Sequence, residues 1–97
     1  MIGKGSLVQI AIQVRPTRYI LGGLATKLGF KATGIGYNLR YRDRTSVEIA
    51  TVTLTKDYTN INQLRDAVAQ AVAQAGWTLG YYPEITVIRL VAGSQAY

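Results

Sequence analysis

The densest group of chemically capable side chains in this sequence lies between residues 37 and 44. Tyrosines and arginines are interleaved there: Tyr37, Arg40, Tyr41, Arg42 and Arg44. Tyrosine rings stack on bases and guanidinium groups bind phosphates, so this pattern suits a single-stranded nucleic acid. The same residue types are favoured at protein–protein interfaces, and charges along an exposed strand also discourage unwanted pairing. The segment is therefore a candidate partner-binding site.

Residues for ordinary enzyme chemistry are scarce. The chain has no histidine and no cysteine, which removes the usual general base, the commonest metal ligand and a thiolate nucleophile. Its acidic residues are dispersed and form no spacing typical of a catalytic pair or a metal site: Asp43, Glu48, Asp57, Asp66 and Glu84. No phosphate-binding or dinucleotide-binding motif is present. We therefore expect a non-catalytic protein with no metal and no other cofactor.

A further candidate site is the segment of residues 15–19, together with Asn38. A helix N-terminus beside arginines can bind an anion. The order of several features resembles that of the acylphosphatases: Arg18-Tyr19, Ala25, Leu28-Gly29, Gly34 and Asn38. By that resemblance Arg18 would bind phosphate and Asn38 would orient water in a small hydrolase. The glycine-rich phosphate loop of that family is replaced here by Val14-Arg15-Pro16-Thr17.

One amphipathic helix, within residues 60–77, organises the elements that position these side chains. Its apolar residues recur at helical spacing: Ile61, Leu64, Val68, Ala71, Val72 and Ala75. Asn60 followed by Gln63 has the form of a capping box, and Gly76 is suited to a left-handed C-cap. The pattern predicts a helix over residues 60–75. We expect its inward side chains, Leu64, Val68, Ala71 and Val72, to pack on a sheet.

The other segments predict strands and one shorter helix. Residues 6–14 alternate, with Val8, Ile10, Ile12 and Val14 on one face and Gln9 and Gln13 on the other. Residues 18–28 predict a short helix, whose Gly22-Gly23 pair we expect to pack closely on a neighbour. Residues 32–42 and 46–55 predict a hairpin with a bulge near Ala50, or else a strand covered on both faces. Residues 85–91 predict the last strand.

This order of elements predicts a single domain over residues 1–97. It corresponds to an α/β (α+β) class, the ferredoxin-like or split β-α-β fold, with a four-stranded antiparallel sheet and two helices on one face. The second and fourth strands would be edges, and Gln9, Gln13, Thr51 and Thr53 would lie on the open sheet face. If residues 18–28 are not helical, the alternative is a mainly β sheet with one packed helix.

The sequence favours a structural function: the protein would be a small assembly subunit that associates with itself or within a larger complex such as a virion. Its expected partner-binding residues are Tyr37, Arg40, Tyr41, Arg42, Arg44, Tyr81 and Tyr82. The net charge of +6 supports a second hypothesis, a nucleic-acid-binding module that uses the 40–44 hairpin. An acylphosphatase-like hydrolase is the third. No apolar run approaches the roughly 20 residues of a membrane helix, so we expect a cytoplasmic or virion location without membrane contact.

Overall fold

The computed structural model describes residues 1–15, 20–28, 30–40 and 46–95. The elements are β1 (Leu7–Ile12), β2 (Val14–Arg15), α1 (Leu21–Leu28), β3 (Phe30–Arg40), β4 (Ser46–Leu54), α2 (Ile61–Gln74), β5 (Thr78–Leu79) and β6 (Glu84–Arg89). The prediction of a mixed α/β fold with antiparallel strands and two helices is confirmed.

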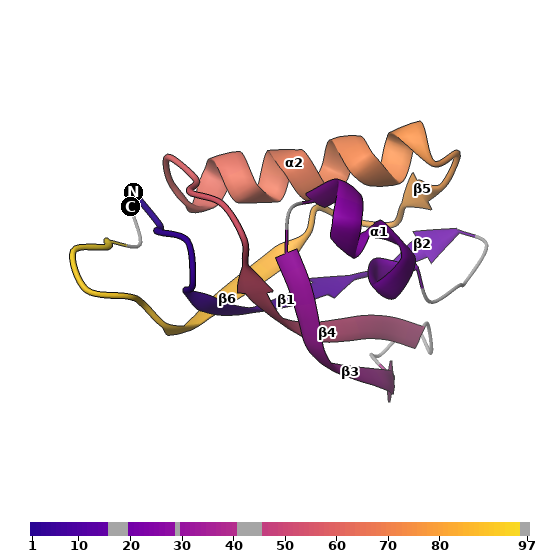
Figure 1. Cartoon of the computed structure of the whole chain (residues 1–97). Coiled ribbons are helices and arrows are strands. Elements are labelled where there is room, and N and C mark those ends of the chain that lie inside the picture. The colour runs from indigo at the N-terminus through magenta and orange to yellow at the C-terminus, as the bar shows by residue number, and fades with distance from the viewer. Residues whose placement is uncertain (16–19, 29, 41–45, 96–97) are drawn as a thin grey trace.

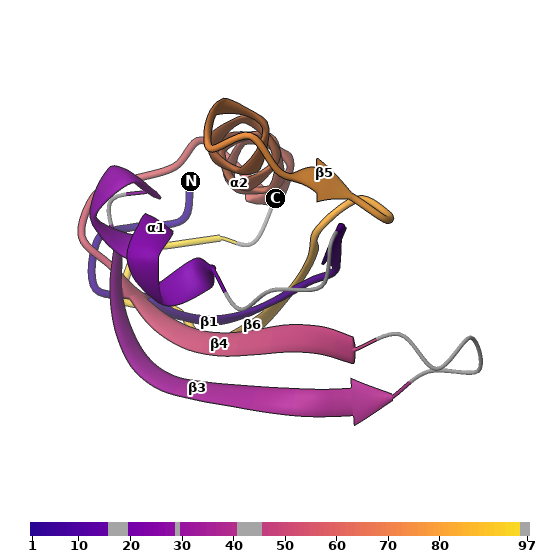
Figure 2. The ribbon, with the colours of Figure 1, turned by 90° about the vertical axis from the view of Figure 1, so that its right-hand side faces the viewer.

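The larger sheet has the strand order β3-β4-β1-β6, and each pair of neighbours is antiparallel. Both helices lie over the same face of this sheet (Figure 1). Viewed from the side, β3 and β4 curve beneath the helix layer (Figure 2). The order places β3 at one edge and β6 at the other.

Strand β4 keeps a continuous register with β1, from Leu7↔Thr53 to Ile12↔Glu48. The bulge predicted near Ala50 is therefore absent from this pair, and the register shifts beside β4 fall on β3, between Ala32 and Gly34 and between Gly36 and Leu39. Side chains at alternate positions, Glu48, Ala50, Val52 and Leu54, are all buried. Val47, on the opposite face, is buried as well, so this end of β4 is covered on both faces.

Helix α2, predicted over residues 60–75, spans Ile61–Gln74, and the two outer predicted residues are its caps. The Asn60 side chain accepts a hydrogen bond from the Gln63 amide at 2.9 Å, and the Gln63 side chain accepts one from the Thr59 amide. At the other end Gly76 has φ +88, and the Trp77 amide donates to the Val72 carbonyl at 3.1 Å. This geometry is a Schellman cap.

The core lies between the helices and the sheet. Leu64, Val68 and Val72 of α2 are fully buried, whereas Ala71 is half-buried against them and Ala75 is exposed. The helix meets the buried face of β1 and the apolar side of α1: Val8, Ile10, Ile12, Leu21, Leu24 and Leu28. The expected close packing at the glycine pair is wrong for Gly23, because nothing lies within 4 Å of a Cβ placed there.

The first predicted strand is divided at Gln13. Val14 pairs with Leu79 in a second, two-stranded ladder, and the Gly80 amide donates to the Gln13 carbonyl at 2.9 Å. The Gln13 side chain is 4 % exposed and lies against Gly80, so its predicted place on the open face beside Gln9 is wrong. A Cβ at Gly80 would collide with the Gln13 side-chain oxygen, which explains the glycine there.

Candidate association surface

The edge strand β6, with the loop before it and the adjacent side of α2, forms the surface that we call the β6 flank. Its residues are Arg65, Asp66, Tyr82 and the strand Glu84–Arg89. Among the described residues, β6 pairs with β1 alone. Its second side therefore has no strand beside it in that part of the chain.

The register shows which backbone groups of β6 face outward. Leu54 exchanges hydrogen bonds with Ser6 and Gly5, so the even-numbered residues of β4 bond to β1. Bonding direction alternates along an antiparallel strand, so Gln9 and Ala11 of β1 face β6 instead. Their partners, Thr86 and Glu84, are then bonded to β1. The amide and carbonyl groups of Ile85 and Val87 consequently point to the outer edge.

The side chains of β6 divide between the two faces of the sheet. Ile85 and Val87 are half-buried against the core. Glu84 and Thr86 are exposed, and Ile88 is 50 % exposed. The register shifts by one residue here, because Val8 pairs with Val87 and Leu7 with Arg89. This bulge puts Ile88 and Arg89 together opposite Leu7.

A groove runs between α2 and the outer edge of β6. It has a volume of about 330 Å³ and is lined by Ile61, Arg65, Glu84, Ile85 and Thr86. Its lining residues include two isoleucines, one arginine and one glutamate. A strand laid beside β6 would border this groove.

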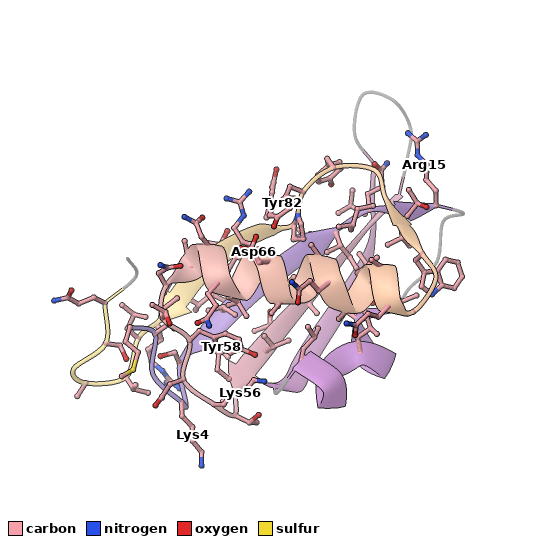
Figure 3. All side chains as sticks on the ribbon, turned by 90° about the horizontal axis from the view of Figure 1, so that it is seen from above. Lys4, Arg15, Lys56, Tyr58, Asp66 and Tyr82 are labelled. Carbon is pink, nitrogen blue, oxygen red and sulfur yellow. The ribbon has the colours of Figure 1, made fainter. Side chains whose placement is uncertain are left out.

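Tyr82, one of the residues predicted to bind a partner, is anchored on α2 beside Arg65, which lines the groove. Its hydroxyl donates to the Asp66 carboxylate, and the Arg65 guanidinium lies 5.2 Å from its ring centre. Arg65 also donates to the Pro83 carbonyl at 2.9 Å. The hydrogen bond to Asp66 raises the pKa of Tyr82. Figure 3 shows Tyr82 and Asp66 on one side of α2, with Tyr58 and Lys56 on the other.

The other predicted partner-binding residues divide between two edges. Tyr81 is half-buried in the loop before β6. Tyr37 and Arg40 belong to β3, at the opposite edge of the sheet. Tyr41, Arg42 and Arg44 lie outside the described residues. The hypothesis of a nucleic-acid-binding hairpin therefore stays a prediction.

Glu48 is a buried carboxylate whose role the sequence interpretation missed. It is 2 % exposed and accepts hydrogen bonds from the amides of Ile20 at 2.6 Å and Leu21 at 2.9 Å. It thus caps the start of α1 from a distant strand. Burial raises the pKa of Glu48, while the hydrogen bonds from Leu21 and Ile20 lower it. In the sequence Glu48 alternates with the apolar residues Ala50, Val52 and Leu54, and this pattern could have indicated that its side chain is buried.

This cap bears on the expected anion site before α1. The Ile20 and Leu21 amides, which a bound phosphate would use, are bonded to the Glu48 carboxylate. Arg18 lies outside the described residues, and Asn38 is in β3. The acylphosphatase-like activity stays a prediction.

Within the described ranges, no three acidic, histidine or cysteine side chains are grouped so that they could hold a metal ion. In the same part of the chain, no helix is long and apolar enough to cross a membrane. Comparisons with protein-family models, with curated proteins and with solved structures find no match.

Proposed function

We propose that this protein is a non-catalytic assembly subunit that associates by accepting a partner strand at the outer edge of β6. The observation that carries the proposal is the outward direction of the Ile85 and Val87 backbone groups. A partner strand would satisfy those donors and acceptors, which is the basis of recognition by strand addition.

The surroundings of β6 support this function. Exposed Ile88 and the groove beside Ile61 and Ile85 offer apolar area next to the outer edge of β6. Tyr82 and Arg65 are of the residue types that contribute most to binding energy at interfaces. Both are held by contacts within the chain, so little side-chain freedom is lost when a partner binds.

We also propose that the arrangement is of the ferredoxin-like, split β-α-β type. The support is the order of the longer elements, in which a strand, a helix and a strand are followed by a second such set. The strand order β3-β4-β1-β6 and the two helices on one face agree with this type (Figure 1). The short ladder of β2 and β5 would be an addition to it.

Two measurements of size test the proposed function. The purified protein is examined by size exclusion with light scattering over a range of concentrations. The protein in gentle extracts of its native source is sized by the same column. We expect a species larger than the monomer in at least one of them. A monomer in both would contradict the proposal.

A pair of proline variants tests whether β6 is the contact. Val87→Pro removes an outward amide, which an edge strand tolerates, so the variant should fold but remain monomeric. Thr86→Pro removes an amide bonded to β1, so this matched variant should be strongly destabilised. Association that persists in folded Val87→Pro would place the contact elsewhere.

A further inference from the structure

We infer that the strand added to β6 is the β6 strand of a second copy, running antiparallel, with Glu84 of each chain beside the partner's Arg89. This inference rests on the proposed function, because it names the partner of the same edge. Two sheets would then join into one across a two-fold axis. Such an interface uses the same patch on both subunits.

The positions of the outward groups select one register. Ile85 and Val87 carry the outward amides and carbonyls, so a pairing of Ile85 with the partner's Val87 uses all of them. By symmetry Val87 then pairs with the partner's Ile85, and Thr86 meets the partner's Thr86 at the axis. Paired threonines are favourable across antiparallel strands, and the β-branched Ile85 and Val87 are residue types that strands prefer.

The charges on β6 are self-complementary in this register. Glu84 begins the strand and Arg89 ends it, so antiparallel pairing brings opposite charges together at both ends. Glu84 lies opposite the partner's Ile88, and the bulge places Arg89 next to Ile88 on the same sheet face. Both charged side chains are exposed, and each is long enough to reach a diagonal neighbour.

The charge around β6 also suits a second copy of a basic chain. Residues 45–97 carry three basic residues in total and four acidic residues, although the whole chain has a net charge of +6. Arg65 and Asp66, beside the groove, balance each other. Two β6 flanks can therefore approach without a large local repulsion.

The apolar side chains of the strand would be better covered in the pair. Ile85 and Val87 are only half-buried, and no described strand lies beyond them at the edge. In the proposed register each covers the other across the new strand pair. The exposed Ile88 would pack on the stem of the partner's Glu84.

Charge reversal tests the register. Glu84→Arg and Arg89→Glu each replace two attractive pairs of the dimer with two repulsive ones. We expect each single variant to raise the dissociation constant of the dimer at least about tenfold, as measured by sedimentation equilibrium at low salt. The double variant, Glu84→Arg with Arg89→Glu, restores opposite charges and should return the constant to within about threefold of the wild type.

The outcomes separate this inference from the proposed function. The register is overturned if the single variants dimerise with the wild-type dissociation constant. It is also overturned if the double variant dimerises as weakly as the single variants. A purified monomer that is found in a larger complex in native extracts overturns self-pairing and leaves strand addition in place. A monomer in both settings overturns both proposals. Circular dichroism of each variant confirms that it is folded.

Discussion

At the scale of single residues, we expect Glu48 to contribute to stability. Its carboxylate is the acceptor for the Ile20 and Leu21 amides at the start of α1. A buried donor without an acceptor costs about 1–3 kcal/mol. We expect Glu48→Ala to lower the free energy of unfolding by about 2 kcal/mol at pH 7, as measured by urea denaturation. An unchanged midpoint of urea denaturation would show that water replaces the carboxylate as the acceptor for these amides.

Glu48 should also make stability depend on pH. Because burial raises its pKa above the ordinary 4.5, the folded chain holds this proton more tightly than the unfolded chain. Its contribution to the free energy of unfolding is then greatest in acid and falls as the pH rises from 4.5 through the folded pKa. Glu48→Gln should flatten that part of the curve. If Glu48→Gln keeps the wild-type dependence of the free energy of unfolding on pH, that dependence belongs to another group.

Gln13 shows a residue whose environment the sequence does not determine. Its place in an alternating run predicts a solvated face, yet the chain passes from β1 to β2 at this point. Its side chain is covered by Gly80, 67 positions later, through the pairing of Val14 with Leu79. A ladder of two-residue strands has no periodicity to detect.

At the scale of elements, α1 offers a direct test of its glycine pair. A Cβ at Gly23 would meet nothing within 4 Å, and its φ is not in the left-handed region. Alanine loses less backbone freedom on folding than glycine, so Gly23→Ala should stabilise the protein by about 0.5–1 kcal/mol. Thermal melting would show a higher midpoint. A lower one would mean that another chain approaches this backbone in solution.

The elements differ in how well their sequences predict them. Helix α2 carries a full apolar stripe, an N-cap at Asn60 and a C-cap at Gly76, so each signal points to the same boundaries. Helix α1 has eight residues and begins at Leu21, later than its spacing predicts, because its cap comes from Glu48 in another strand. The shift of β6 at Leu7 has no local signal, since a bulge depends on both strands.

The candidate surface was predictable only in part. Tyr82 was among the expected partner-binding residues and lies on the β6 flank, although that role itself stays a prediction. Arg65 and Asp66 could not be placed beside it, because their positions depend on how α2 lies over the loop at Pro83. The outward direction of Ile85 and Val87 follows from the pairing of three strands, which a single segment does not reveal.

At the scale of the whole molecule, the two sheet edges differ in charge and in setting. The β3 edge leads to the arginine-rich segment, whereas the β6 edge has one acid and one base at its ends. In a dimer joined through β6, the two β3 strands would lie at the far edges of one continuous sheet. Self-association through β6 would therefore leave the β3 edge uncovered.

Amide exchange at β6 measures strand addition most directly, because the strand contains its own control. In a dilute sample the Ile85 and Val87 amides should exchange quickly, while the Thr86 amide, bonded to β1, exchanges slowly. At a concentration where the protein associates, all three should exchange slowly in NMR spectra. Rapid exchange of Ile85 and Val87 in the associated protein would contradict strand addition at β6.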